Sequence, residues 1–325
     1  MISRRQAVIA LGVSSLVSPF GVLAQQTAKI VRVGFLTVRS RAENRNFPFF
    51  MTGMQALGYV EGKNLTIEYL SGEVAQFPEM AAELVRRGVD VIVAPNPETA
   101  IATKNVTTSI PIVVVVVGDP VRSGLVESLA RPGGNVTGLT AFGSDLGGKR
   151  LELLKEISPR ITRVGAIWNP TVPDKVIEWI ETDRAARALG MRLLSLEVKT
   201  AGEFDAAYAT ARRLRVEAII VFGLPLMSEN SPRTAAFAND ARVPAIFPWR
   251  ETVEAGGLMS LGPSIKDNYR RAAGYVDKIL KGARPAELPI EQPVKLEMYV
   301  NAKAARTLGI KIPNSILVRA DKVIE

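Results

Sequence analysis

The stretch IPIVVVVVGDP, residues 110–120, carries five consecutive valines and then stops at a glycine and a proline. An unbroken run of β-branched residues is typical of a strand covered on both faces, as in a parallel sheet. The segments around it alternate between strand-like apolar runs and amphipathic helical runs, which predicts an α/β fold. Strands are expected at residues 30–36, 64–70, 89–95, 110–117 and 135–142, and helices at residues 48–58, 77–88 and 99–109.

The same order of segments begins again about 130 residues later. Arg32-Val33-Gly34 corresponds to Arg163-Val164-Gly165, and VDVIV at residues 89–93 corresponds to VEAIIV at residues 216–221. ALG at 56–58 and IP at 110–111 are matched by ALG at 188–190 and VP at 243–244. Four matches in one order at nearly one spacing predict two similar lobes, and 325 residues suit two domains.

The end of the chain indicates how the two lobes are connected. Three crossings between them are expected, near residues 140–145, 261–266 and 284–293, with Gly143, Gly262 and Pro293 as hinge residues. The first lobe is then predicted to hold residues 25–141 and 264–283, and the second lobe residues 142–263 and 284–325. The predicted fold class is α/β, with two Rossmann-like lobes that have parallel sheets and are joined by a three-stranded hinge.

Residues 1–24 have the features of an export signal. Arg4 and Arg5 precede an apolar run over residues 7–17, and Val22-Leu23-Ala24 resembles a cleavage site. The apolar run is shorter than the roughly 20 residues of a membrane span. We therefore expect cleavage after Ala24 and a periplasmic location, by either the secretory or the twin-arginine route.

The chain has no Cys and no His, which excludes thiolate nucleophiles, Ser-His-Asp relays and Cys/His zinc sites. No metal or cofactor is expected, and an enzyme of this composition would have to rely on carboxylates, Lys or Tyr. The formal net charge is +9, but the basic residues are scattered among acids. That pattern is typical of solvated helix faces, so nucleic acid is not an expected partner.

GSDLGGKR, residues 143–150, nearly matches the phosphate-binding pattern G-x-x-x-x-G-K-[ST]. Arg150 replaces the hydroxyl residue that would ligate Mg²⁺, and the stretch follows the last strand of a lobe instead of the first. We interpret its glycines as hinge flexibility and Lys149 as part of an exposed helix start.

A ligand of an open α/β sheet lies beyond the carboxyl ends of the strands. In the first lobe these ends place Thr37, Phe47, Asn96, Glu98, Thr99, Asp119, Thr140 and Phe142 at the cleft between the lobes. In the second lobe they place Trp168, Asn169, Gly223, Leu224, Trp249, Arg250 and Leu261 there.

Polar residues of the first lobe allow two interpretations each. Asn96 and Thr99 open a helix, where they could hold a ligand carboxylate at the positive end of the helix dipole. They could equally form an ordinary N-cap. Asp119 could accept an ammonium group, or it could be a turn residue before Pro120.

Aromatic and basic residues of the second lobe are also open to two interpretations. Trp168 and Trp249 each end a strand, where they could stack on a flat ligand or pack in the core. Arg250 could pair with a carboxylate or be a solvated loop charge. Arg39, Arg41 and Arg45 form a basic loop in the first lobe, which could bind an anion or form a solvated rim, and we favour the solvated rim.

Four stretches resemble the substrate-binding proteins of ABC importers, in particular the group associated with tryptophan and tyrosine uptake. They cover residues 56–69, 110–140, 148–159 and 270–325, and contain the specific runs GDP at 118–120, RPGGN at 131–135 and RAD at 319–321. The resemblance implies the type I periplasmic-binding fold and a monomer that closes on a small ligand and delivers it to a permease and its ATPase. The chain departs from this group at Leu261, where such proteins often have Tyr.

The expected ligand is an aromatic or apolar amino acid or a related carboxylate. Two other functions stay open at this point. One is a periplasmic α/β enzyme that uses carboxylates such as Asp119 and Glu98. The other is a ligand-sensing domain of the same fold.

Overall fold

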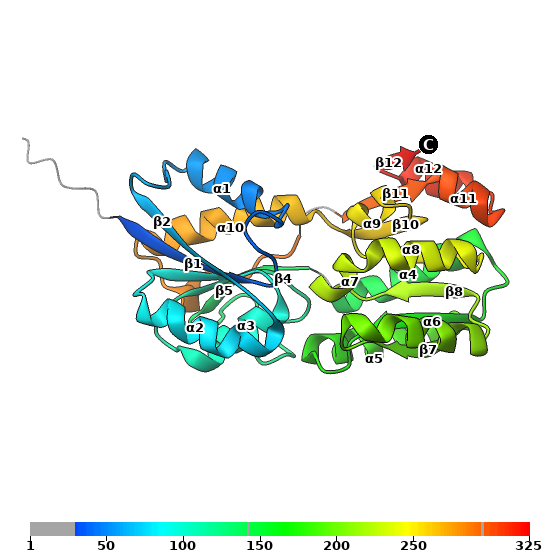
Figure 1. Ribbon diagram of the computed structural model, residues 1–325, viewed down its shortest axis with the longest axis horizontal. Coiled ribbons are helices and arrows are strands. Elements are labelled where there is room, and N and C mark those ends of the chain that lie inside the picture. The colour runs from blue at the N-terminus through cyan, green and yellow to red at the C-terminus, as the bar shows by residue number, and fades with distance from the viewer. Residues whose placement is uncertain (1–29, 142, 294–295) are drawn as a thin grey trace, which may run out of the picture.

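The protein is described from a computed structural model that covers residues 30–141, 143–293 and 296–325. The predicted export signal and Phe142 lie outside these residues. Figure 1 shows two α/β lobes side by side along the long axis of the molecule. Among the helices of the described ranges, none is long and apolar enough to cross a membrane.

The first lobe is built on a five-stranded, fully parallel sheet. Its strands are β1 (Val31–Thr37), β2 (Leu65–Ser71), β3 (Val91–Ala94), β4 (Ile112–Val117) and β5 (Val136–Thr140), in the order β2-β1-β3-β4-β5. Its helices are α1 (Phe47–Ala56), α2 (Phe77–Arg86), α3 (Pro97–Val106) and α10 (Ile265–Leu280), with short helices η1 (Val74–Gln76) and η3 (Pro285–Glu287). Helices α1 and α10 cover one face of the sheet, and α2 and α3 cover the other (Figure 1). Their apolar side chains pack with those of the strands. Val113, Val114, Val115 and Val117 are fully buried between these layers, as the valine run predicted.

The second lobe is built on a seven-stranded sheet. Its strands are β6 (Arg163–Trp168), β7 (Arg192–Glu197), β8 (Ala218–Val221), β9 (Ala245–Phe247), β10 (Met259–Pro263), β11 (Leu296–Asn301) and β12 (Lys322–Ile324), in the order β12-β11-β10-β9-β8-β6-β7. Its helices are α4 (Gly143–Ile157), α5 (Pro173–Ala188), α6 (Phe204–Arg213), α7 (Pro225–Glu229), α8 (Ser231–Asp240), α9 (Arg250–Glu254), α11 (Ala302–Leu308) and α12 (Asn314–Arg319), with the short helix η2 (Ala201–Glu203). Only the β10–β11 pairing is antiparallel among the described strands.

The predicted duplication is confirmed by the strand order. The first five strands of the second lobe run β7-β6-β8-β9-β10, which repeats the order β2-β1-β3-β4-β5. The matched sequence motifs form equivalent hydrogen bonds in both lobes. The Asp90 carboxylate accepts a hydrogen bond from the Arg32 backbone N–H at 2.7 Å, and the Glu217 carboxylate accepts one from the Arg163 N–H at 3.0 Å. Each acid therefore anchors the start of the neighbouring strand.

The third crossing begins later in the chain than residue 284. Ile290 packs with buried residues of β4 and β5, and the backbone of Glu291 bonds to Gly138 and Thr140 of β5. Residues 285–291 thus pack with the first lobe, and Pro293 lies between them and β11. Gly143 is the first residue of α4, and Gly262 lies inside β10. That Gly143, Gly262 and Pro293 act as a hinge stays a prediction.

GSDLGGKR forms the first two turns of α4, not a flexible loop. An ideal Cβ on Gly147 would lie 1.9 Å from the Thr182 Oγ1 atom of α5. The close packing of α4 against α5 therefore explains Gly147, in place of the hinge flexibility that the sequence suggested for this glycine. Lys149 is exposed, as expected, but Arg150 is only 2% exposed and points into the protein.

Candidate ligand-binding cleft

A cavity of about 870 Å³ lies between the two lobes, beyond the carboxyl ends of the strands. In the first lobe its wall includes Thr37 at the end of β1, Asn96 after β3 and Val116 of β4. In the second lobe it includes Gly223 after β8 and Trp249 after β9. This is the position that the topology of two open parallel sheets predicts.

Four helices of ten or more residues direct their N-termini at the cavity. They are α1, α3 and α10 from the first lobe and α8 from the second, and their first residues or caps line the wall. The unpaired N–H groups at a helix N-terminus carry partial positive charge. The cavity is therefore suited to a ligand with an anionic group.

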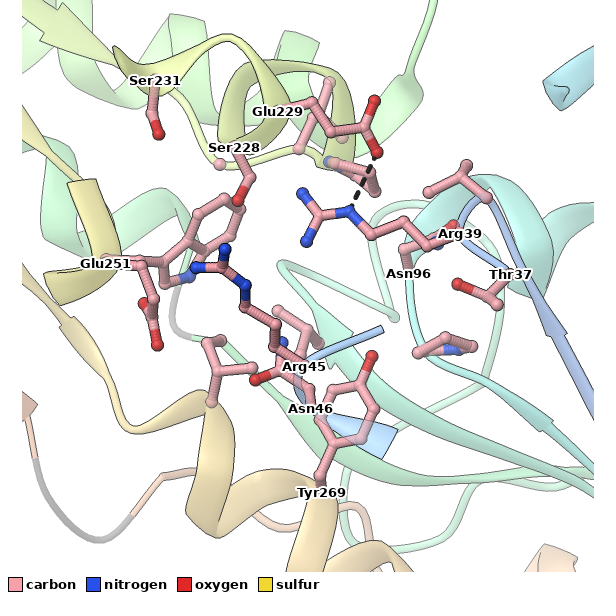
Figure 2. Close-up of a pocket in the computed structure, with 18 of the residues that line it drawn as sticks. Thr37, Arg39, Arg45, Asn46, Asn96, Ser228, Glu229, Ser231, Glu251 and Tyr269 are labelled. Carbon is pink, nitrogen blue, oxygen red and sulfur yellow. Dashed lines mark hydrogen bonds and ion pairs between the residues drawn. The ribbon is translucent and has the colours of Figure 1, made fainter. Parts of the chain in front are cut away.

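Charged side chains of opposite sign face each other across the cavity. Figure 2 shows Arg39 and Arg45 reaching in from the first lobe, and Glu229 and Glu251 from the second. The Arg39 Nε atom lies 3.1 Å from the Glu229 Oε1 atom, so this ion pair joins the two lobes directly. Arg45 is exposed and has no hydrogen bond or ion pair with any residue that the structure describes, which leaves its guanidinium available to a ligand.

Aromatic side chains form part of the wall. Trp249 lies at the lobe interface and packs against the apolar cluster of the first lobe. An ideal Cβ on Gly223 would lie 2.8 Å from the Trp249 Cζ2 atom, so any larger residue at position 223 would clash with the indole. Phe49 and Tyr269 complete the aromatic part of the wall. Burial raises the pKa of the Tyr269 hydroxyl, which therefore stays protonated at neutral pH.

Five of the residues predicted for the cleft line the cavity: Thr37, Asn96, Gly223, Leu224 and Trp249. Asn96 also forms an N-cap, because its Oδ1 atom accepts hydrogen bonds from the Thr99 N–H at 3.0 Å and the Thr99 hydroxyl at 3.1 Å. Its Nδ2 group has no partner among the described residues and can still donate. Thr99 is fully buried, so it belongs to the cap alone.

The structure places Phe47 and Trp168 in the cores of their lobes instead of the cleft wall. The Phe47 ring packs edge-on against Phe35, with 5.0 Å between ring centroids. Trp168 stacks on Trp179 at 4.8 Å, and its indole N–H donates to the Ser195 hydroxyl at 2.8 Å. Core packing, the alternative considered for Trp168, therefore accounts for its position.

Asp119 and Asn169 have local roles and do not line the cavity. The Asp119 Oδ1 atom accepts hydrogen bonds from the backbone N–H groups of Val121 and Arg122, at 3.2 and 2.9 Å. The Asn169 Oδ1 atom accepts from the N–H and hydroxyl of Thr171, at 3.0 and 2.8 Å. Both side chains therefore stabilise turns, which is the second interpretation given for Asp119.

Arg250, Thr140 and Leu261 also lie outside the cavity wall. Arg250 donates to the Tyr299 hydroxyl at 3.2 Å and lies over its ring. Thr140 is buried, and the Leu261 carbonyl accepts a hydrogen bond from Arg150 at 2.9 Å. The Leu261 side chain is not among the residues that line the cavity, so the departure from the family at this position does not alter the wall. Glu98 is partly buried beside Asp174 and Lys175, away from the cavity wall, and Phe142 lies outside the described residues.

The pattern of strand ends missed several residues of the cavity wall: Arg45, Asn46, Phe49, Ser228, Glu229, Ser231, Glu251, Glu254, Ile265, Lys266 and Tyr269. Most of them lie in the first turns of helices that follow the strands. Arg39 and Arg45 were interpreted as a solvated rim, but both line the cavity. The same helix N-termini that indicated Asn96 would have located many of the others.

Two lobes around one cavity lined by charged side chains of both signs define a two-lobed ligand-binding protein. The model of the family described as ABC transporter substrate binding protein matches residues 37–324. The chain therefore belongs to this family, and its architecture is the type I periplasmic-binding fold.

Individual relatives support the same assignment. A protein of Vibrio cholerae, described as a conserved domain protein, is 29% identical, with a TM-score of 0.85 over 91% of this chain and 100% of that one. An ABC domain from Streptococcus pneumoniae, solved in complex with L-Trp, is 25% identical, with a TM-score of 0.84 over 90% and 99%. The tyrosine-binding protein of Clostridioides difficile is 25% identical over 81% of this chain and 76% of its own length.

Proposed function

We propose that the protein captures a zwitterionic amino acid with an aromatic or apolar side chain and delivers it to an ABC permease and its ATPase. The observation that carries this proposal is the charge of the cavity wall, with Arg45 and the Asn96 amide as free donors on the first lobe and Glu229 and Glu251 on the second. The first lobe also adds the Glu43 carboxylate, which accepts a hydrogen bond from the Ser40 hydroxyl. A zwitterion bridges such walls, and its binding stabilises the closed arrangement of the lobes.

Each part of the ligand has a partner in the cavity wall. Its carboxylate is bound by the Arg45 guanidinium, the Asn96 Nδ2 group and the N-terminus of α3. Its ammonium group is bound by Glu251 or Glu229. Its side chain packs against Trp249 and the neighbouring aromatic rings.

The relatives support the choice of ligand. One is named a tyrosine-binding protein and another was solved with L-Trp. Membership of the family supports action outside the cytoplasm. That the protein acts as a monomer, after removal of residues 1–24, is part of the proposal. The enzyme alternative has less support, because Asp119 stabilises a turn and the cavity wall lacks both Asp119 and Glu98.

The ligand class is tested by calorimetric titration of residues 25–325 with L-tryptophan, L-tyrosine and L-leucine. Tryptamine, which lacks the carboxylate, and indole-3-propionate, which lacks the amine, serve as matched half-ligands. We expect the amino acids to bind and both half-ligands to bind much more weakly, because each leaves one charged wall unsatisfied. Equal binding of tryptophan and indole-3-propionate would instead assign the site to aromatic acids.

The role of Arg45 is tested by the Arg45→Gln variant. Loss of a charge-assisted hydrogen bond of about 1.5–3 kcal/mol corresponds to roughly tenfold to hundredfold weaker binding of the amino acid. Arg160→Gln, an exposed arginine in the turn before β6, is the control and should bind normally. Unchanged affinity in Arg45→Gln would remove Arg45 from the site, and chemical conversion of the bound amino acid would favour the enzyme.

A further inference from the structure

A buried charged cluster lies at the interface between the lobes, outside the cavity wall. Glu98, which is partly buried, comes from the first turn of α3 in the first lobe. The other members come from the second lobe and are each at most 4% exposed: Asp174, Lys175 and Glu178 of α5, and Arg150 of α4. The Asp174 Oδ2 atom accepts a hydrogen bond from the Gly118 N–H at 3.2 Å, so the start of α5 is fixed against the end of β4.

The four buried charges of the second lobe neutralise one another. The Lys175 Nζ atom lies 2.7 Å from the Glu178 Oε2 atom and 3.5 Å from the Asp174 Oδ2 atom. The Arg150 Nη1 atom lies 3.3 Å from the Glu178 Oε1 atom. Two cations therefore already balance two carboxylates, and Glu98 would be a third carboxylate without a cation of its own.

Glu98 and Asp174 approach each other from the two lobes. The Glu98 Oε2 atom and the Asp174 Oδ1 atom are both sealed from solvent, and neither has a hydrogen-bond partner among the described residues. Asp174 and Lys175 are the charged side chains that act on Glu98. The nearby Asp119 and Arg122, after β4, are bound to a turn and to Glu181. Two ionised carboxylates in this position would repel each other, whereas one proton would remove the excess charge.

We infer that the interface between α3 and α5 is a proton-binding site that is completed when the lobes close, so that closure takes up a proton on the Glu98–Asp174 pair. Burial, with a smaller contribution from the charge of Asp174, raises the pKa of Glu98 from 4.5 to about 7. Burial also raises the pKa of Asp174. Opening separates α3 from α5 and returns Glu98 to water, where its pKa is ordinary.

The direction of the pH effect follows from the higher pKa in the closed form. The stabilisation of the closed form is complete below pH 4.5 and is lost as the pH rises through about 7. Uptake of one proton changes the closed-to-open ratio by up to about tenfold per pH unit within this window. The chain has no His, so ordinary side chains do not titrate between pH 5.5 and 8.0 and cannot produce the same effect.

The test measures the distance between the lobes without ligand, so it is independent of the ligand that we propose. Spin labels are attached at Ala42→Cys and Ala236→Cys, two exposed positions on different lobes. The chain has no Cys of its own, so no other position is labelled. Double electron–electron resonance at pH 5.5 and 8.0 gives the populations of closed and open forms. We expect the closed-to-open ratio to fall by about tenfold or more between these pH values.

Two variants locate the effect. Glu98→Gln mimics the protonated side chain and should stay closed at both pH values. Glu79→Gln is the matched control, since Glu79 also follows a proline in the first turn of a helix but is exposed, and it should respond like the unmodified chain. If Glu98→Gln does not fold, Asp174→Asn should still shift the midpoint of the response to lower pH. A ratio that does not change with pH, or that changes equally in Glu98→Gln, would overturn the inference.

Discussion

Replacing Glu178 with Gln should destabilise the second lobe strongly. Glu178 is 1% exposed and is the acceptor for both Arg150 and Lys175, at 3.3 and 2.7 Å. The amide has nearly the same shape as the carboxylate, so the substitution leaves no cavity. It removes one negative charge and leaves two buried cations with Asp174 as the only remaining carboxylate that forms an ion pair within the cluster.

The size of the effect follows from burial. Removing one partner of a buried ion pair costs about 3–5 kcal/mol, because the remaining charge is desolvated without compensation. Burial lowers the pKa of Arg150 from its ordinary value, while Asp174 and Glu178 overcome burial to raise the pKa of Lys175. Both side chains remain cationic at neutral pH. Asp183→Asn, on the same helix, is the matched control: Asp183 pairs with Arg187 at the surface and should contribute at most about 0.5 kcal/mol.

Urea denaturation followed by tryptophan fluorescence measures this loss directly. Two of the three tryptophans, Trp168 and Trp179, pack in the second lobe, so their signal reports its unfolding even if the lobes unfold separately. Trp249 lies at the lobe interface and reports the contact between the lobes as well. We expect a clear fall in the transition midpoint for Glu178→Gln and almost none for Asp183→Asn. A loss below about 1 kcal/mol in Glu178→Gln would mean that water reaches the cluster and that our account of its electrostatics is wrong.

Two further substitution pairs test the glycines and the tryptophans. Gly262→Ala should lower the melting temperature, because its Cβ would lie 1.9 Å from the Pro248 carbonyl oxygen. Gly274 lies in a helix and has nothing near the position of a Cβ, so Gly274→Ala should stabilise the folded protein by about 0.5–1 kcal/mol. Equal effects of the two would contradict the packing role of Gly262. Trp168→Phe should reduce stability, because the stacking and the hydrogen bond of Trp168 are lost, and should leave ligand affinity unchanged. Trp249→Phe should weaken ligand binding and change stability little. Calorimetry and thermal melts of both variants check this, and weaker binding in Trp168→Phe would contradict it.

The fold could be predicted from the sequence because it depends on local patterns. Apolar periodicity located the strands, and the recurrence of similar motifs indicated two lobes. Asp90 and Glu217 show why the motifs recur, since each anchors the backbone at the same point of its lobe. The end of the first lobe could not be placed, because residues 285–291 join it mainly through backbone hydrogen bonds to β5, and the few side chains that pack there, such as Ile290, form no periodic pattern.

The candidate site could be predicted only in part. The ends of strands have a fixed position in the fold, which is why Asn96 and Trp249 were found. The direction of a side chain depends on its neighbours, so the sequence did not distinguish Trp249 from Trp168, whose partner Trp179 lies on another element. Arg150 shows the same limit, because only packing reveals that it is buried beside Glu178.

The position of α10 bears on how the chain acquires its structure. This helix packs against α1 and supplies Tyr269, Ala272, Ala273 and Val276 to the core of the first lobe, although the whole of β6 to β10 precedes it in the chain. The Tyr59 hydroxyl also donates to the Asp277 carboxylate of α10 at 3.1 Å. During synthesis, the amino-terminal half therefore emerges with one sheet face covered only by α1 and cannot finish folding until most of the polypeptide has been made. A core that is completed late keeps the nascent chain unfolded for longer, and an unfolded polypeptide can pass through a membrane pore.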